Sequence, residues 1–357
     1  MKSPDFSYLK AQTMADVFSA LQEHGDSAQL LAGGQSLLAM LNLRMANPKI
    51  LIDISGLESL KGIHKTGDVV RIGALTTHHE VLSSSIVQTH VPLLAQAVPY
   101  VAHLAIRNKG TIGGSLALGD PAAEYPAVAL ALNATLVIQS ASGERRVKAI
   151  DFFLSLYRTA VQAHEVLIAV EFPVATSNQR FVFSELARRK GDYAMVGMAL
   201  AISLEGHTIQ DASLAFMAMD DKPILAPHAM KAMVGQPINQ QTIAEAQKGL
   251  DAEGFDASGS DTCLKIACMH NLLSTAKLLM PKCPFGCTWS IICATNWASR
   301  VRTWVVSMAF AVPAKSWWMG KLCGVALPWQ FKPMANRCKP LRASLKAESC
   351  NNCRLLF

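Results

Sequence analysis

The first 262 residues contain no cysteine, although the 357-residue chain has nine. A stretch without thiols needs no oxidising compartment, and we therefore expect a cytoplasmic protein. The amino-terminal sequence MKSPDFSYLKAQT lacks the apolar segment of a secretory signal. A long apolar run is also missing around the tryptophans, where residues 303–314 form an uncharged stretch of only twelve. Because a spanning helix needs about 20 apolar residues, we predict no transmembrane segment.

Acidic residues are almost absent from the end of the chain. Residues 263–357 carry 13 lysines and arginines but a single acid, Glu348, whereas residues 1–262 carry 20 basic and 25 acidic side chains. All nine cysteines and all six tryptophans also lie after residue 262. Basic segments often bind nucleic acid or membranes. Here charge, cysteine and tryptophan change at one point, which indicates a change in the origin of the sequence, and we expect no nucleic-acid partner.

The residues before 258 have the periodicity of an α+β protein. Apolar Met14, Val17, Phe18 and Leu21 have helical spacing, and HVPLLAQAVPYVAH predicts another helix. The runs KILIDIS, VVRIGAL and EVLIAVEFP predict strands, and ATLVIQSASGERRVKAIDFF predicts a hairpin closed by Ser-Gly. After a linker, VATSNQ, three antiparallel strands precede two helices, APHAMKAMVGQ and QTIAEAQKGLDAE, that cover one face. Beyond about residue 258 the periodicity is incoherent.

Two glycine turns are the strongest chemical signals. Paired glycines let backbone N–H groups surround an anion without interference from a Cβ atom, and a following helix adds its dipole. Either turn alone is also consistent with an ordinary tight turn, and neither matches the usual dinucleotide or nucleotide fingerprint. The residues are Ala32, Gly33, Gly34, Gln35 and Ser36 in the first turn, and Thr111, Ile112, Gly113, Gly114 and Ser115 in the second.

The two turns, taken together with the sequences that flank them, form a pattern specific enough to identify a family. The segments LLAGGQSLLAMLNLRMANPKILIDI, IRNKGTIGGSLALGDPAAEYPAVALALNATLVI, DFFLSLYRTAVQAHEVLIAVEFP and RRKGDYAMVG stand in this order within residues 1–258. This region resembles the FAD-binding medium subunit of the molybdenum hydroxylases, and within that group the carbon monoxide dehydrogenase type. The resemblance implies a PCMH-type FAD-binding domain over residues 1–175, with subdomains 1–55 and 56–175. A smaller α+β domain, shortened at its end, would follow over residues 178–258.

The resemblance also implies an activity and partners. The chain would be an electron-transfer flavoprotein of an oxidoreductase, acting in the cytoplasm or at the inner face of the membrane. A molybdopterin-binding large subunit would oxidise the substrate, and a small subunit with 2Fe-2S clusters would pass the electrons to FAD. A quinone, NAD or oxygen would then receive them. The three subunits would form a heterotrimer that dimerises, and no side chain of this chain would need to act as acid or base.

Site residues follow from the same resemblance. Both glycine turns would hold the FAD pyrophosphate, Glu124 would bind the ribityl chain, Leu167 would pack near the adenine, and Tyr193 would lie near the isoalloxazine ring. Alternatives stay open. Asp120 could bind the ribityl chain or cap the helix that Glu124 begins, Glu124 could be a helix-start acid, and Tyr193 a strand-edge aromatic.

Two charged or metal-binding patterns have simpler interpretations. Adjacent residues such as His78 and His79 point apart and have no third ligand in view, so we expect a solvated helix start and no metal site. The run Arg188, Arg189 and Lys190 is typical of a solvated surface, and a role near the cofactor or a partner subunit is the alternative.

The tail, residues 259–357, contains recognisable motifs when its codons are read one base out of frame. Read from the last base of each codon, WVVSMAFAVPA is compatible with VGCEHGVCGAC, KSWWMGK with KVLVDGK, and PLRAS with TIEGL. The first has the C-x4-C-x2-C spacing of plant-type 2Fe-2S proteins, and together they resemble the small subunit of this family. Our hypothesis is that residues 259–357 are an out-of-frame translation into that neighbouring gene. The alternatives are a genuine cysteine-rich tail or a zinc module built on CPFGC and CNNC.

Two other functions compete with the leading one. A self-contained flavin oxidoreductase with the same FAD fold would need its own substrate pocket and often a covalent flavin link, for which residues 1–262 offer no cysteine. A frameshifted product that cannot assemble with its partners is the non-enzymatic alternative.

Overall fold

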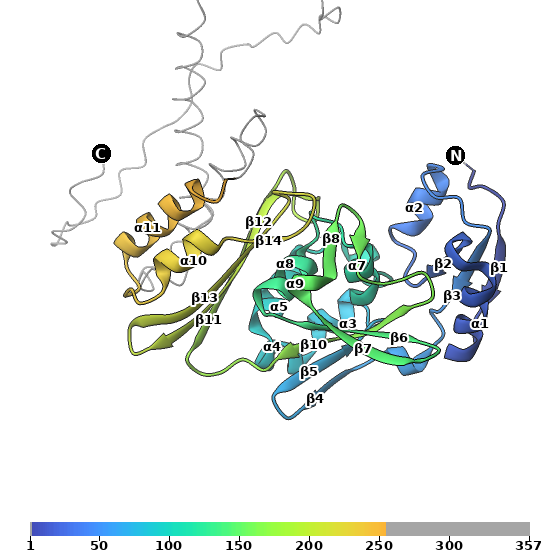
Figure 1. Ribbon diagram of the computed structural model, residues 1–357, viewed down its shortest axis with the longest axis horizontal. Coiled ribbons are helices and arrows are strands. Elements are labelled where there is room, and N and C mark those ends of the chain that lie inside the picture. Colours follow the sequence, from blue (N-terminus) through green and yellow to red (C-terminus); the bar gives the residue numbers. More distant parts are fainter. Residues whose placement is uncertain (1, 255–357) are drawn as a thin grey trace, which may run out of the picture. The chain divides into compact units, whose positions relative to one another are not determined.

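The computed structural model describes residues 2–254, and everything below concerns that part of the chain. Its first unit is a three-stranded parallel sheet of β1 (Ser7–Lys10), β3 (Ile50–Asp53) and β2 (Ala28–Leu31), in that order. Helices α1 (Met14–His24) and α2 (Leu37–Asn42) belong to the same unit (Figure 1). The predicted first helix is confirmed: Thr13 and Asp16 form a capping box, and Gly25 ends it.

The second unit is a five-stranded antiparallel sheet in the order β4-β5-β10-β6-β7. The strands are β4 (Ile63–Thr66), β5 (Val69–Gly73), β10 (Val166–Pro173), β6 (Thr135–Ser140) and β7 (Gly143–Lys148). The predicted strands and hairpin are confirmed. However, Ser140 pairs with Gly143, so the hairpin turn consists of Ala141 and Ser142, and Gly143 already begins β7.

Short helices join these strands and pack against the sheet. They are α3 (His78–Ser83), α4 (Ser85–His90), α5 (Pro92–Ala97), α6 (Leu104–Arg107), α7 (Ile112–Leu118), α8 (Glu124–Ala131) and α9 (Ala149–Phe152). The helix predicted from HVPLLAQAVPYVAH is real but shorter: α5 stops at Ala97 and a 3-10 turn, Val98–Tyr100, follows. The interruption falls at Pro99, which lacks the N–H that a continued α-helix requires. A small hairpin of β8 (Phe153–Ser155) and β9 (Arg158–Thr159) completes this unit.

The third unit is an antiparallel sheet of β11 (Gln179–Ala187), β12 (Ala194–Glu205), β13 (Thr208–Met217) and β14 (Ile224–Leu225). Helices α10 (Pro227–Met233) and α11 (Gln240–Asp251) bury one face of this sheet in a core that includes Met198, Leu200 and Leu214. The opposite face, with Phe183, Ala199 and Met217, shares a core with Leu94 and Val128 of α5 and α8. The predicted α+β fold is therefore confirmed, including the two helices on one face.

No helix within residues 2–254 is long and apolar enough to cross a membrane. The tail from residue 259 onward, and with it the out-of-frame hypothesis and the zinc alternative, lies outside the described residues.

Candidate functional site

A cavity of about 790 Å³ lies where the three units meet. Its volume falls within the range of small-molecule and cofactor sites, roughly 300–1,000 Å³. Twelve of the thirteen residues predicted to bind the cofactor line this cavity. Ile112 does not, because its side chain is fully buried in the protein core. The residues that line the cavity are Ala32, Gly33, Gly34, Gln35, Ser36, Thr111, Gly113, Gly114, Ser115, Glu124, Leu167 and Tyr193.

The first glycine turn joins β2 to α2 and has unpaired donors. The backbone N–H groups of Gly33, Gly34, Gln35 and Ser36 donate to no protein group within residues 2–254. Gly33 has no room for a side chain, because a Cβ atom there would lie 2.1 Å from the carbonyl oxygen of Lys109. Gly34 has a left-handed φ of 70°. This turn therefore fits an anion that would accept several backbone hydrogen bonds.

The second turn differs from the expected one. Its N–H groups are already used: Ile112 donates to Thr76 O at 3.0 Å, Gly113 to Ala74 O at 2.9 Å, and Gly114 to Thr111 Oγ1 at 3.1 Å. The prediction that consecutive free amides surround an anion is thus wrong for this turn. The cause is tertiary: α7 packs so closely that a Cβ at Gly113 would lie 2.4 Å from Ala74 Cβ. Glycine at position 113 permits this close packing, and no side chain extends from it into the cavity.

The two turns touch each other. Besides the Lys109 contact, a Cβ at Gly33 would lie 2.9 Å from Gly110 Cα, and a Cβ at Gly110 would meet the ring of His78 at 2.6 Å. The backbone N–H of His78 donates to Gly110 O at 3.0 Å. The cavity wall at this point is consequently built from segments about 75 residues apart in sequence, and they approach this closely because Gly33 and Gly110 have no side chains.

Two acids line the cavity together with the glycine turns. Glu124 is the first residue of α8, and burial, together with the neighbouring Asp120, raises its pKa to about 7. Asp120 accepts a hydrogen bond from the backbone N–H of Ala122 at 2.9 Å, and burial raises its pKa too. The alternative that Asp120 caps α8 is wrong, because the N-cap residue is Ala123 and no side chain caps this helix. Both acids line the cavity.

A third acid, Glu185, was not suggested by the sequence analysis. It lies on β11, two residues beyond Phe183, so its side chain leaves the same face of the sheet. Its Oε2 atom is buried and has no hydrogen-bond partner. Burial and the nearby Glu124 raise the pKa of Glu185 to about 8. The local sequence of β11 does not indicate that the Glu185 carboxyl is buried.

Leu167 and Tyr193 reach the cavity from different units. Leu167 is buried on β10 next to an irregularity in its pairing with β6. Tyr193 precedes β12, and 74% of its side chain is exposed. Its loop is held by close packing, since a Cβ at Gly191 would lie 2.7 Å from Ala102 O. Arg107 fixes that carbonyl, donating from Nη1 to it at 2.7 Å. Tyr193 is thus an exposed loop aromatic rather than a strand-edge residue.

The prediction that His78 and His79 are both exposed to solvent is wrong for His78. His79 is exposed, but His78 is buried, and its Nδ1 lies 3.0 Å from the Tyr125 hydroxyl. Burial, followed by the Arg107 charge, lowers the pKa of His78 to about 4, so the ring is neutral at physiological pH. Thr77 and Glu80 form a capping box that turns the first residue of α3 inward. The run Arg188, Arg189 and Lys190 is exposed as predicted.

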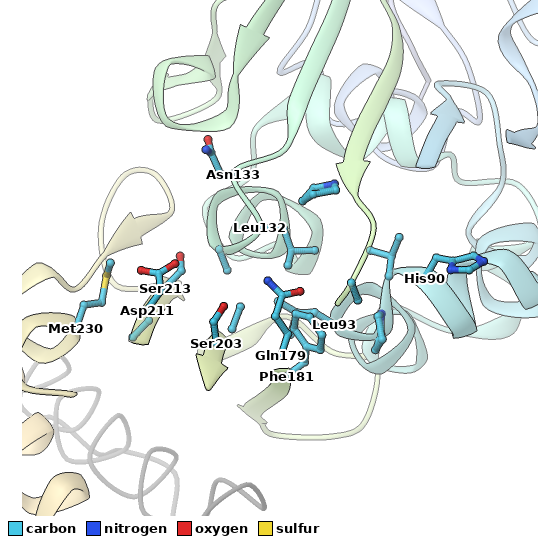
Figure 2. A pocket seen from close by; sticks show the side chains of 17 residues that line it. His90, Leu93, Leu132, Asn133, Gln179, Phe181, Ser203, Asp211, Ser213 and Met230 are labelled. Atoms are coloured by element: carbon cyan, nitrogen blue, oxygen red, sulfur yellow. The ribbon is translucent and has the colours of Figure 1, made fainter. Parts of the chain in front are cut away.

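A second, smaller cavity of about 290 Å³ lies at the other end of the contact between α8 and the third sheet. Figure 2 shows its polar side chains, which include Asn133, Gln179 and Asp211. None of the thirteen predicted site residues lines it. Within residues 2–254, no group of three or more metal-ligating side chains is found in either place.

The comparisons with known proteins agree with this geometry. Residues 4–175 match the family model "FAD binding domain in molybdopterin dehydrogenase", and residues 181–256 match "CO dehydrogenase flavoprotein C-terminal domain". The glyceraldehyde dehydrogenase medium chain of Sulfolobus acidocaldarius is 40% identical over 245 residues, which cover 69% of this chain and 86% of that protein. The carbon monoxide dehydrogenase medium chain of Hydrogenophaga pseudoflava is 34% identical over 246 residues, with the same coverage of each chain.

A solved structure resembles the fold as well. Carbon monoxide dehydrogenase from Hydrogenophaga pseudoflava, in a form that lacks the Mo-pyranopterin moiety of its cofactor, aligns with a TM-score of 0.75 at 33% identity. The alignment covers 78% of this chain and 98% of that one. The predicted family is therefore confirmed: the chain belongs to the FAD-binding medium subunits of the molybdenum hydroxylases, a family of oxidoreductase flavoproteins.

Proposed function

We propose that this chain binds FAD in the 790 Å³ cavity with its pyrophosphate on the first glycine turn. The supporting observation is the set of four unpaired N–H groups from Gly33 to Ser36, the kind of donor array that binds phosphate oxygens. The second turn would contribute close backbone approach and the Ser115 hydroxyl. This assignment gives the two similar motifs different tasks.

The rest of the cofactor would extend across the cavity from this point. Glu124, with Asp120 as its neighbour, would accept hydrogen bonds from ribityl hydroxyls. Leu167 would offer an apolar surface to the adenine, and Tyr193 an aromatic surface to the isoalloxazine ring. FAD supplies the redox chemistry when bound, since a flavin takes up electrons singly and releases them in pairs. The chain's own residues bind and orient it, and none acts as a catalytic acid or base.

Electrons would reach this flavin from 2Fe-2S clusters of a small subunit. A molybdopterin-binding large subunit would oxidise the substrate, and a quinone, NAD or oxygen would take the electrons from FAD. The names of the relatives support this arrangement, because they are medium chains of such dehydrogenases. We propose a heterotrimer that dimerises and works in the cytoplasm or at the inner face of the membrane. The large subunit would choose the substrate.

The domain division and the tail complete the proposal. A PCMH-type FAD-binding domain would span residues 1–175, with subdomains 1–55 and 56–175, and a shortened second domain would span 178–258. Residues 259–357 would be the out-of-frame translation described above. Sequencing the DNA across codons 250–265 tests this last point. A single intact frame there, together with a tail peptide detected by mass spectrometry, would refute it.

The test of the FAD site uses the full chain and a matched pair of glycine variants. We expect the wild-type chain to bind FAD that is visible by absorbance and reducible by dithionite. Gly33→Ala should lose most of this binding, since its Cβ would push the turn from Lys109. Gly56→Ala should keep it, because the nearest atom to a Cβ there is 3.8 Å away. A wild-type chain that binds no FAD, or equal binding in all three proteins, would contradict the proposal.

A further inference from the structure

Tyr157 has a backbone conformation that its side chain disfavours. It lies in the two-residue turn between β8 and β9, where Ser155 pairs with Arg158, and its φ is +54°. Left-handed positions in such short hairpin turns are usually taken by glycine, asparagine or aspartate. A bulky residue there is a true outlier, and outliers of this kind gather at ligand sites. Folding of the hairpin therefore gives no reason for a tyrosine at this position.

The turn is held firmly against the cofactor cavity. Thr159, on β9, packs on the end of α7, where a Cβ at Gly119 would lie 2.9 Å from Thr159 Cγ2. Helix α7 carries the second glycine turn. Tyr157, Arg158 and Thr159 all line the 790 Å³ cavity, and 55% of the Tyr157 side chain is exposed. The strained turn thus presents a phenol ring to the cavity from a fixed support.

A second exposed tyrosine lies close by on another unit. Tyr193 lines the same cavity. Partial burial, and then the Asp120 carboxylate, raise the pKa of both phenols, and the Tyr157 phenol also raises the pKa of Tyr193. Two aromatic rings from separate loops are therefore neighbours of one carboxylate at the same end of the cavity. Neither ring forms a ring-to-ring contact with another aromatic within residues 2–254, and both residues are more than half exposed.

We propose that Tyr157 is a second aromatic contact of the isoalloxazine ring, opposing Tyr193 at that end of the cavity. This rests on the proposed FAD site. A planar ring gains stacking or edge contacts from each aromatic neighbour. The left-handed turn aims the phenol toward the cavity, and glycine or asparagine would relieve the backbone but remove the ring. Strain at Tyr157 is then the consequence of a binding requirement.

The test uses Tyr157→Gly in the full chain, because glycine removes the ring and the strain together. Thermal unfolding without FAD should show a variant at least as stable as wild type. Its FAD dissociation constant should rise about 3- to 10-fold, the loss of one aromatic contact. ADP, which carries only the adenine and pyrophosphate half, should compete for the site with unchanged affinity. The bound flavin should also fluoresce more strongly, since a tyrosine ring in contact quenches flavin emission.

Two further variants complete the experiment. Tyr157→Phe should keep wild-type FAD affinity, because the ring remains. Asn133→Gly relieves another left-handed residue, with φ of +48°, at a place that does not line this cavity, and it should leave FAD binding unchanged. Wild-type FAD affinity and emission in Tyr157→Gly would overturn the inference, as would an equal loss of ADP affinity. A wild-type chain that binds neither FAD nor ADP would instead refute the proposed function.

Discussion

The ionisation of Glu124 links the stability of the chain to pH, and Glu124→Gln tests this link. The folded protein holds the pKa of Glu124 at about 7, against an ordinary value of 4.5, because the carboxyl is largely buried beside Asp120. At a pH between these two pKa values, Glu124 has lost its proton in the unfolded chain but keeps it in the folded chain. Stability from this group is therefore complete below pH 4.5 and is lost as the pH rises toward 7.

The expected magnitude follows from the shift. A pKa shift of about 2.5 units corresponds to a contribution of about 3 kcal/mol to the free energy of unfolding. About 2.5 kcal/mol of this contribution is lost between pH 5 and pH 8.5. Glutamine stays neutral and has nearly the same shape. The free energy of unfolding of Glu124→Gln should therefore exceed that of wild type by about 2.5 kcal/mol more at pH 8.5 than at pH 5.

Urea unfolding of the full chain without FAD, at both pH values, measures this difference. Glu144→Gln is the control for the removal of one carboxylate from the chain, because Glu144 is exposed on β7. Parallel pH profiles for wild type and Glu124→Gln would refute the reasoning. Glu185→Gln should flatten the profile in the same direction, since burial and Glu124 raise the pKa of Glu185 as well.

Two predictions concern side chains that support the cavity. Tyr125→Phe should cost about 1–3 kcal/mol in urea unfolding, because it leaves the buried Nδ1 of His78 without a partner. Tyr8→Phe should cost less, since Tyr8 is 56% exposed and solvent can replace its bond to Asp53. Glu165→Gln should destabilise the chain at pH 7, because Glu165 accepts two hydrogen bonds from Arg145, at 2.7 and 2.6 Å. Arg145 lowers the pKa of Glu165 in the folded chain. The stabilisation by this ion pair is therefore present when the pH is above the ordinary pKa of a glutamate, and it disappears as the pH falls through the pKa of Glu165 in the folded chain. Unfolding curves of wild type and Glu165→Gln should then converge in acid, and a constant gap would speak against an ionic origin.

Local sequence signals predicted most of the elements. Thr13 and Gly25 mark the ends of α1, and continuous runs of apolar residues mark β6, β10 and β12, because capping and strand formation depend on near neighbours. The residues that meet in the cavity could be named only through the resemblance to a family. No spacing rule brings Ser36, Glu124 and Tyr193 together, since they come from three different units.

The failures share one cause, which is tertiary packing. His78 was expected in solvent, but the inward start of α3 buries it against Tyr125. The amides of the second glycine turn were expected to be free, but the carbonyls of Ala74 and Thr76 take them. The local sequence pattern does not identify Tyr157 or Glu185, because it shows neither a strained turn nor a buried unpaired oxygen.

The contact between the two glycine turns would make cofactor binding at the proposed site and assembly of the units depend on each other. Only glycine fits at position 33, because Lys109 and Gly110 lie against it, and only glycine fits at position 110, because the His78 ring lies against it. A side chain at either glycine would separate the turns and, with them, the first unit from the second. The free amides of residues 33–36 would then no longer line the same cavity as Glu124 and Tyr193. A cofactor that spans both sides, as the proposed site requires, would consequently stabilise the contact between the units as well as being bound by it.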